Sequence, residues 1–316
     1  MELVEVAAVA ARLREQIARV VMGQDRSVEL LFAAWLAGGH VLLEGVPGTA
    51  KTLLARALAR SLQLRFARIQ FTPDLMPADV LGTSLFDFQS GRFTLQKGPI
   101  FTELLLADEV NRTPPKTQSA LLEAMQERSV TLDGQTHALG AAFFVVATQN
   151  PIEQEGTYPL PEAQLDRFLL KLRIGYPERD DERRMASVHG RTVPDLESFA
   201  LEPIAGAEFL VAARESVAAV RIEDSVLDYL VDVVRATREH AALRCGASPR
   251  AVNMLAAAAR SLAAVQGMDF VIPDHVQQLA GPLLAHRVVL TPAAEIEGAD
   301  ATTVVNEIVA GIKAPR

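Results

Sequence analysis

The sequence contains a single cysteine among its 316 residues, Cys245. One cysteine cannot build an internal disulfide framework or a cysteine-based zinc site, so we expect a reducing, cytoplasmic setting. No apolar run reaches the roughly 18 residues of a membrane span, and the alanine-rich stretch 251–265, which comes nearest, contains Arg260. Residues 1–5 show no basic segment followed by an apolar one, so we expect no secretion signal.

The sequence also lacks an excess of basic residues. Lysine and arginine number 31 against 39 aspartates and glutamates, which gives a net charge of −8. Proteins that bind a phosphate backbone usually carry basic faces, so we do not expect a dedicated nucleic-acid role. Apolar residues make up 49% of the chain, enough for a sizeable core, and the length of 316 residues suggests more than one domain.

The first half of the chain alternates short apolar runs with segments of helical period. Four apolar runs of strand length lie at 41–43, 104–107, 143–147 and 168–174. Near-continuous apolar strands are typical of a parallel sheet that is covered on both faces. The amphipathic segment 51–62 is typical of the covering helices. The predicted fold class is therefore α/β, with a parallel sheet covered by helices.

The second half shows a different pattern. Gly175-Tyr176-Pro177 ends the last apolar run, and a charged segment follows. Helical periodicity then dominates, at 226–237, 249–266 and 273–285, and no segment has a strong strand pattern. We predict a nucleotide-binding α/β domain over residues 1–176 and a smaller all-helical lid domain over residues 177–316.

Two segments of the first domain alternate apolar and polar residues around a turn. Residues 85–96 do so around Ser90-Gly91, and residues 130–139 do so around Asp133-Gly134. Asp-Gly is a strong signal for a two-residue hairpin turn. Both segments are predicted to be inserted β-hairpins, and their pattern alone indicates no more than decoration of the domain's edge.

A glycine-containing loop follows the first apolar run and opens an amphipathic helix. It comprises Gly45, Val46, Pro47, Gly48, Thr49, Ala50, Lys51 and Thr52. Its N–H groups and the helix N-terminus would cradle phosphates, Lys51 would reach the β- and γ-phosphates of ATP, and Thr52 would bind Mg²⁺. Alanine tolerates a positive φ poorly, so we expect Ala50 to be right-handed. A chance match is the alternative, and the flanking strand and helix argue against it.

Two adjacent carboxylates end the apolar run 104–107. Neighbouring side chains on a strand point to opposite faces, so the pair could divide the work. Asp108 would hold Mg²⁺ through its water shell, and Glu109 would act as general base on the attacking water. Two solvated loop acids are the alternative, which the upstream phosphate loop disfavours. For Arg112, which follows closely, a functional role and a plain surface charge stay equally open.

Three further polar residues are candidates for the site. Asn150 follows the third apolar run and could hold the lytic water or the γ-phosphate, although an Asn-Pro turn closing a strand is common. Arg167, on a short helix predicted at 161–168, is either a solvated charge or a residue that reaches a neighbouring subunit's γ-phosphate. Arg250 starts a helix capped by Ser248, where a cation is unfavourable unless an anion completes the site.

In this order the motifs resemble those of the MoxR group of AAA+ ATPases over nearly the full chain. The phosphate loop is similar to that group's Walker A, which also has alanine before its lysine. Residues 108–112 resemble its Walker B, residues 147–151 its sensor 1, and residues 155–168 its arginine-finger segment. Residues 248–250 resemble its sensor 2, and residues 286–287 with 295–298 resemble its closing segment. A lone phosphate loop would be weak evidence, but the ordered combination is specific.

The resemblance implies properties that spacing does not show. It implies ring hexamers with ATP between subunits, so that Arg167 and also Arg250 would act on a neighbour's nucleotide. It implies that Gly23 and Gln24 lie beside the adenine and that the hairpins face the pore or a client. It further implies a chaperone-like ATPase that remodels or matures a protein partner, often one with a von Willebrand factor A domain, and sometimes aids metal-cofactor insertion.

Three other functions stay open at this point. A magnesium-chelatase-like motor subunit shares most of these motifs, and the stretch 157–168 is what favours the MoxR group. A DNA translocase would carry a basic winged-helix domain, whereas this acidic sequence ends soon after the predicted lid. A nucleotide-switched scaffold that barely hydrolyses ATP is disfavoured by the presence of Glu109 and Arg167.

Overall fold

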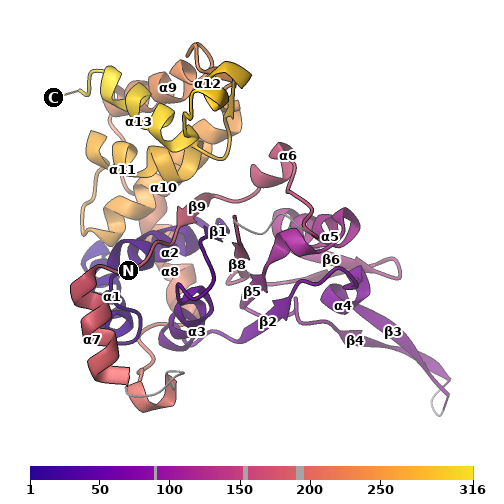
Figure 1. Cartoon of the computed structure of the whole chain (residues 1–316). Coiled ribbons are helices and arrows are strands. Elements are labelled where there is room, and N and C mark those ends of the chain that lie inside the picture. The colour runs from indigo at the N-terminus through magenta and orange to yellow at the C-terminus, as the bar shows by residue number, and fades with distance from the viewer. Residues whose placement is uncertain (89–90, 152–155, 190–195, 316) are drawn as a thin grey trace.

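The computed structural model describes residues 1–88, 91–151, 156–189 and 196–315. At its centre lies a parallel sheet of five strands in the order β2-β5-β8-β1-β9 (Figure 1). The strands are β1 (Val41–Glu44), β2 (Phe66–Gln70), β5 (Leu104–Asp108), β8 (Phe144–Gln149) and β9 (Leu170–Arg173). The predicted α/β class and its parallel sheet are therefore confirmed.

Burial explains which strands the sequence predicted. All five residues of β5 are buried, as are the first five of β8, so these strands are continuous apolar runs. In β2, at the sheet's edge, only Ile69 is buried. The edge strand therefore carries no apolar run, and the sequence did not predict it.

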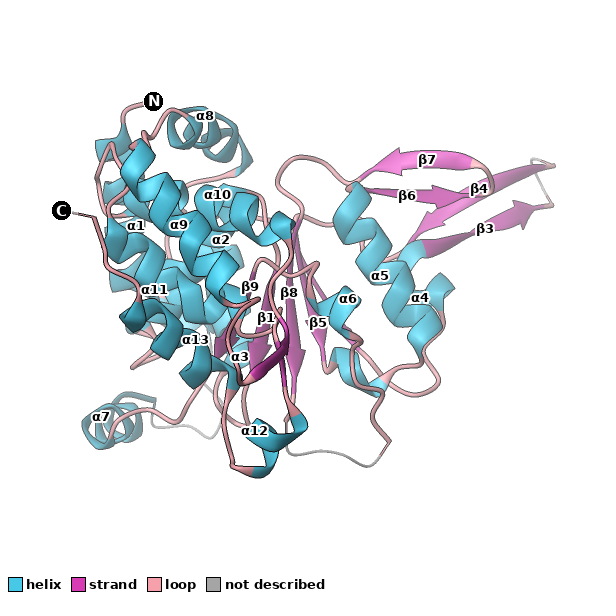
Figure 2. Cartoon of the chain, turned by 90° about the horizontal axis from the view of Figure 1, so that it is seen from above, coloured by secondary structure: helices cyan, strands magenta, loops and turns pink. Residues whose placement is uncertain are grey.

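The two faces of the sheet are covered by different helices, as Figure 2 shows. Val41 and Leu43 of β1 join the larger apolar core with α1 (Leu3–Ala18), α2 (Asp25–Ala37) and α3 (Lys51–Ser61). Leu42, between them, joins a second core with α4 (Pro77–Leu81) and α5 (Pro115–Glu127) on the opposite face. The alternation of side chains along the strand thus divides the core into two layers.

Both predicted hairpins are present, and both extend from the side of the sheet that carries α4 and α5 (Figures 1 and 2). The first pairs β3 (Gly82–Asp87) with β4 (Arg92–Lys97), and Ser90 of its predicted turn lies outside the described residues. The second pairs β6 (Ser129–Leu132) with β7 (Gln135–Ala138). Asp133 and Gly134 of its turn have φ of 47° and 78°, as a two-residue turn of this kind requires.

The second half of the chain is mainly helical. Its helices are α7 (Arg179–His189), α8 (Ala207–Ala218), α9 (Asp224–Ala236), α10 (Pro249–Val265), α11 (Pro273–Leu284), α12 (Pro292–Ile296) and α13 (Ala301–Gly311), with a 3₁₀ turn at Leu196–Phe199. The expectation of no strand was wrong, because β10 (Leu243–Cys245) pairs with β11 (Val289–Leu290). Only Leu243 in this ribbon is buried, so its sequence has no strand pattern.

The two halves share one apolar core. Leu255 and Leu262 of α10 belong to the same buried cluster as Trp35 of α2 and Leu13 of α1. The sheet and the helical part therefore pack directly on one another. Among the described residues, no helix combines the length and the apolarity that crossing a membrane would take.

Candidate nucleotide-binding and catalytic site

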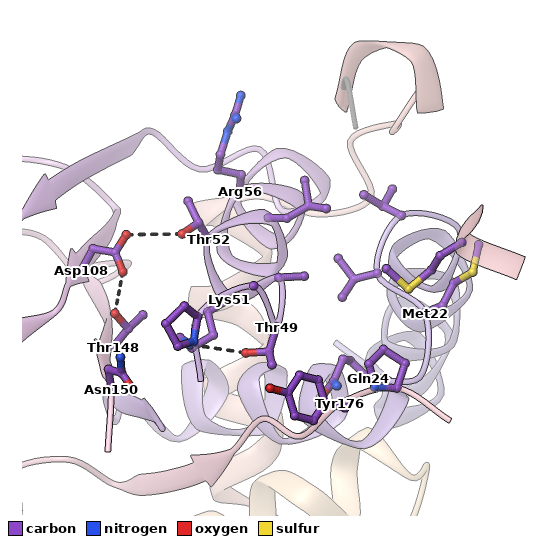
Figure 3. A pocket seen from close by; sticks show the side chains of 18 of the residues that line it. Met22, Gln24, Thr49, Lys51, Thr52, Arg56, Asp108, Thr148, Asn150 and Tyr176 are labelled. Atoms are coloured by element: carbon purple, nitrogen blue, oxygen red, sulfur yellow. Dashed lines mark hydrogen bonds between the residues drawn. The ribbon is translucent and has the colours of Figure 1, made fainter. Parts of the chain in front are cut away.

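A cavity of about 870 Å³ lies at the carboxyl ends of the central strands (Figure 3). Ligands of parallel α/β sheets commonly bind at this edge. Its walls come from four places: the chain before α2, the phosphate loop, the strand ends and α7. The lining includes Val21, Met22, Gln24, Pro47, Gly48, Thr49, Ala50, Lys51, Thr52, Arg68, Gln70, Asp108, Glu109, Thr148, Asn150, Tyr176, Glu182 and Met185.

The phosphate loop joins β1 to α3 and has the predicted form. A Cβ at Gly45 would lie 2.5 Å from the carbonyl oxygen of Ile174, and Gly48 has a φ of 84°, so both positions need glycine. Lys51 Nζ donates to the carbonyl oxygens of Gly45 and Val46, at 2.7 Å each. Burial lowers the pKa of Lys51, while the nearby carboxylates oppose that shift.

Ala50 differs from the expectation. Its φ of 60° and ψ of 19° are left-handed, so the predicted right-handed conformation was wrong. The loop has to turn here because the carbonyl of Ala50 already accepts the N–H of Leu54, at 2.8 Å, as the first bond of α3. A left-handed alanine costs about 1–2 kcal/mol. The Ala50 side chain packs against the larger core, which offsets part of that cost.

Asp108 is the best-connected acid of the cavity. Its Oδ1 accepts the Thr148 hydroxyl at 2.6 Å, and its Oδ2 accepts the Thr52 hydroxyl at 3.3 Å. Arg68, on the neighbouring strand β2, donates to the same Oδ2 through Nε and Nη2, at 3.1 and 2.8 Å. The side chain of Asp108 is only 11% exposed. Asp108 and Thr52, the predicted magnesium-binding pair, thus lie in direct contact, and their hard oxygen atoms suit that ion.

Glu109 lies in the same cavity for a reason that strand alternation did not predict. β5 ends at Asp108, and Glu109 then takes a left-handed conformation with a φ of 59°. This turn directs both acids to the cavity instead of to opposite faces. The Oε2 of Glu109 accepts from Gln70 Nε2 at 2.7 Å and pairs with Arg112 Nε at 3.0 Å. Arg112 is therefore a partner of the predicted base.

The end of β8 completes this wall of the cavity. Thr148 is fully buried, and its hydroxyl oxygen also accepts the backbone N–H of Glu109, at 2.9 Å. Asn150, two residues further on, is buried and lines the cavity beside Thr148 (Figure 3). The predicted meeting of Asn150 with the two acids at one sheet edge is thus observed.

The opposite end of the cavity is formed by the segment before α2 and by α7. Gln24 lines the cavity, as expected of a residue beside a base, together with Met22. Gly23 makes the turn without lining the cavity: a Cβ there would lie 2.9 Å from Asp181 Oδ2 of α7. Nothing in the sequence indicated that α7 would contribute to this wall, because its charged pattern is that of a solvated helix.

Arg167 and Arg250 lie outside the lining of this cavity. Arg167 directly follows Asp166, just beyond α6 (Glu162–Leu165), which is shorter than the helix predicted at 161–168. Arg250, in the first turn of α10, pairs with Asp166 at 3.7 Å. The anion that accompanies Arg250 within this chain is therefore Asp166. Ser248 is the N-cap residue of α10 as predicted, although its hydroxyl makes no capping hydrogen bond.

A buried arginine holds the segment that carries Arg167. Arg287 Nε donates to Asp166 Oδ1 at 2.8 Å, and its Nη2 donates to the Asp166 carbonyl at 3.0 Å. The same guanidinium group donates to the carbonyl oxygens of Phe168 and Leu169. Burial lowers the pKa of Arg287 to about 10, and Asp166 opposes that shift. Arg287 thus fixes the backbone on both sides of Arg167.

Comparison with known proteins agrees with this geometry. The AAA family, described as the ATPase family associated with various cellular activities, matches residues 40–170, and the AAA lid domain matches residues 235–308. Uncharacterized protein YeaC of Bacillus subtilis is 50% identical over 95% of this chain and 93% of its own length. Chaperone MoxR1 of Mycobacterium tuberculosis is 44% identical over 95% of this chain and 81% of its own length.

A solved structure matches the whole fold. The crystal structure of a candidate ATPase from Cytophaga hutchinsonii superposes with a TM-score of 0.89 at 37% identity, over 99% of this chain and 97% of the other. Fold, cavity and relatives together define an AAA+ ATPase with a helical lid. Within that class, the chain belongs to the MoxR family.

Proposed function

We propose that this ATPase binds ATP with Mg²⁺ in the cavity and couples its hydrolysis to the remodelling or maturation of a protein partner. Lys51 and the loop Gly45–Thr52 would bind the phosphates, and Thr52 with Asp108 would hold the metal, the aspartate through water. The bound Mg²⁺ would neutralise charge on the phosphate oxygens. The observation that carries the proposal is the contact of Asp108 with Thr52 and Thr148 beside Lys51, Glu109 and Asn150.

Two residues of the cavity would act on the attacking water. Glu109 would accept its proton as general base, and Asn150 would hold the water or the γ-phosphate. Both line the cavity, and they come from neighbouring strands of the sheet. Gln24 and the turn at Gly23 would lie at the adenine end. These roles account for Lys51, Thr52, Asp108, Glu109 and Asn150 in one reaction.

We assign Arg167 and Arg250 to a neighbouring subunit's nucleotide, in a ring that we propose to be a hexamer. Support comes from their position: both lie outside the lining of their own chain's cavity. Arg167 follows Asp166 in the segment that the buried Arg287 holds, and Arg250, on α10, pairs with the same Asp166. An arginine supplied in trans commonly raises turnover about 10³-fold or more.

The proposed partner is a client protein with a von Willebrand factor A domain, and metal-cofactor insertion into that client would be one outcome of the remodelling. The relative named as a chaperone supports a remodelling role. The β3–β4 hairpin offers a contact surface, because Leu85, Phe86 and Phe93 are 51%, 43% and 72% exposed on a projecting element (Figure 1). We place this work in the cytoplasm and divide the chain into an α/β domain at 1–176 and a lid at 177–316.

A magnesium-chelatase-like motor is the second candidate, and a DNA translocase is a weaker third. The test is a pull-down with the Glu109→Gln chain in ATP, which should hold a client in a stalled complex. Lys51→Ala and ADP are the controls that should release it. Recovery of a von Willebrand-type protein only with Glu109→Gln and ATP would support the proposal. Recovery of chelatase subunits or of nucleic acid would move the function to a rival.

A further inference from the structure

Arg68 makes a contact in the nucleotide cavity that the reaction described above does not use. It lies on the edge strand β2, and both Nε and Nη2 donate to Oδ2 of Asp108, at 3.1 and 2.8 Å. The Thr52 hydroxyl donates to the same oxygen at 3.3 Å. Three donors from two side chains therefore converge on one carboxylate oxygen of the proposed magnesium-binding pair.

Arg68 supplies the positive charge that Asp108 needs. The side chain of Asp108 is 11% exposed, and a carboxylate so well buried requires a compensating charge. Lys51, the cation of the phosphate loop, donates to the carbonyls of Gly45 and Val46. The guanidinium of Arg68 is thus the cation in direct contact with the aspartate.

The contact between Arg68 and Asp108 can be replaced by another cation at low cost. Arg68 is 48% exposed along its side chain, against 11% for Asp108, so its charged end can move into water while the acid stays in place. A half-exposed ion pair contributes little net stability, typically about 0–1 kcal/mol. A divalent ion held by Thr52 and Asp108 would compete for the lone pairs that Arg68 now occupies.

We propose that Arg68 is the resident cation of Asp108 and that Mg²⁺ entering with the nucleotide displaces it, so that Arg68 sets the magnesium requirement of the site. This inference rests on the proposed assignment of Thr52 and Asp108 to the metal. Arg68 is a positioning residue: it acts on the nucleotide through Asp108.

The same displacement would reach the general base. Arg68 Nη2 also donates to Gln70 Oε1 at 2.8 Å, and Gln70 Nε2 donates to Glu109 Oε2 at 2.7 Å. Asp108, Arg68, Gln70 and Glu109 therefore form one continuous chain of hydrogen bonds. When Arg68 withdraws, Gln70 Oε1 loses the hydrogen bond that it accepts from Arg68. The side chain of Gln70 is then less restrained, and its hydrogen bond to Glu109 weakens. The site would thus release its base when the metal arrives.

The test is a magnesium titration of binding to a fluorescently labelled ADP, with the full chain. Arg68→Gln should lower the Mg²⁺ midpoint about tenfold, the size of one hydrogen bond to a charged group. Its affinity for labelled ADP in EDTA should stay the same. Arg68→Lys, which keeps the charge but loses the two-point contact, should give an intermediate shift.

Arg56 provides the matched control. It lines the same cavity from α3, and its side chain points away from Asp108 (Figure 3). Arg56→Gln removes the same charge from the cavity without breaking the contact with Asp108. A general electrostatic effect would therefore shift the midpoint in both glutamine variants alike, whereas displacement of Arg68 shifts it in one.

Three outcomes would overturn the inference. These are an unchanged midpoint in Arg68→Gln, a shift no larger than that of Arg56→Gln, and a loss of metal-free ADP binding in Arg68→Gln, which would make Arg68 a phosphate ligand. A wild-type chain that binds labelled ADP without any dependence on Mg²⁺ would instead contradict the proposed metal site itself. The wild-type curve therefore tests the site, and the difference between variants tests Arg68.

Discussion

Two aspartates of this chain each face arginines, in opposite ways. Asp108, in the nucleotide cavity, pairs with Arg68, which is 48% exposed. Asp166, beside Arg167, pairs with Arg287, whose side chain is 1% exposed, and with Arg250, which is 50% exposed. The exposed arginines can exchange their aspartate for the charges of a ligand, whereas the buried one fixes the backbone. A similar ion pair can therefore form an exchangeable contact or a structural one, according to the burial of its arginine.

The residues of the proposed reaction also fall into two groups, those that line the cavity and the two arginines that lie outside it. The cavity brings the phosphate loop, the acids and Asn150 together within one chain, but neither Arg167 nor Arg250 belongs to its lining. Arg167 instead lies on the backbone segment that Arg287 holds, and Arg250, on α10, meets that segment through Asp166. In the described part of the chain, the nucleotide cavity lies at one place and these two arginines lie outside its lining, as the proposed exchange of arginines between subunits requires.

Among the substitutions considered, Arg167→Ala should have the largest effect on ATP turnover. Turnover should fall about 10³-fold or more while nucleotide binding remains, because the transition-state charge would lose its cation. Steady-state hydrolysis of ATP and binding of labelled ADP measure the two quantities separately. Mixing Arg167→Ala with Glu109→Gln subunits should restore some turnover, since some interfaces would then combine an intact base with an intact arginine. Absence of rescue at every mixing ratio would count against action in trans.

Glu109→Gln should have the next largest effect, on the cavity side of the comparison. Loss of a general base lowers turnover about 10²- to 10⁴-fold. ATP affinity should be retained, because the phosphate loop and Lys51 are untouched. Lys51→Ala is the matched variant that should lose nucleotide binding itself. Undiminished turnover in Glu109→Gln would contradict the assignment of Glu109 as the base. Tight ATP binding by Lys51→Ala would contradict the assignment of the loop Gly45–Thr52 as the phosphate-binding loop.

The sequence predicted the parts of the cavity that depend on local pattern. The phosphate loop, the two acids and Asn150 each follow an apolar run that forms a central strand, and parallel strands bring their carboxyl ends to one edge. Local pattern was insufficient for conformation, as Ala50 and Glu109 show: both are left-handed without being glycine. In each case the chain must turn sharply between a hydrogen-bonded element and the cavity.

The residues that the sequence missed are those whose partners are distant in the chain. Arg68 meets Asp108 across 40 residues, and Gln70 meets Glu109 across 39. Arg287 belongs to the segment that resembles the family's closing segment, but its contact with Asp166, across 121 residues, was not predicted. Neither Arg68 nor Gln70 stood out, because they alternate on an edge strand that has no apolar run. Their spacing of two residues, which puts them on one face of β2, becomes meaningful only beside β5.

Arg287→Met should sharpen the contrast in stability. Removing the buried partner of an ion pair costs roughly 3–5 kcal/mol, and Asp166 would keep the longer, exposed contact with Arg250, at 3.7 Å. Arg250→Met, at an exposed pair with the same aspartate, should cost only about 0–1 kcal/mol. Urea unfolding of the two variants measures the free energies directly. If both variants are destabilised by the same amount, burial does not distinguish the scaffold from the exchangeable pair.

Acid should lower the free energy of unfolding, with the smallest of these effects, through buried histidines beside Arg287 and elsewhere in the core. His286 Nε2 lies 2.6 Å from Arg287 Nη1, and burial, followed by the Arg287 charge, holds the pKa of His286 well below 6.5. Burial also lowers the pKa of His40, in the α5-side layer, to about 4. Below pH 6.5 these two histidines bind protons in the unfolded chain but stay neutral in the folded one. The free energy of unfolding should therefore fall as pH falls.

At pH 5 the destabilisation from His40 alone should be about 2 kcal/mol relative to pH 8, since one pKa unit corresponds to about 1.36 kcal/mol. His286→Gln should reduce the remaining slope, because the glutamine cannot take up a proton in the unfolded state, while His275, whose pKa burial also lowers, keeps its share. Urea unfolding at pH 8, 6.5 and 5 compares the slopes, and the pH 8 value corrects for the change in packing and hydrogen bonding that the substitution itself causes. An unchanged slope would mean that the folded chain can hold protonated His286 beside Arg287. The pKa of His286 would then not be lowered as its burial implies.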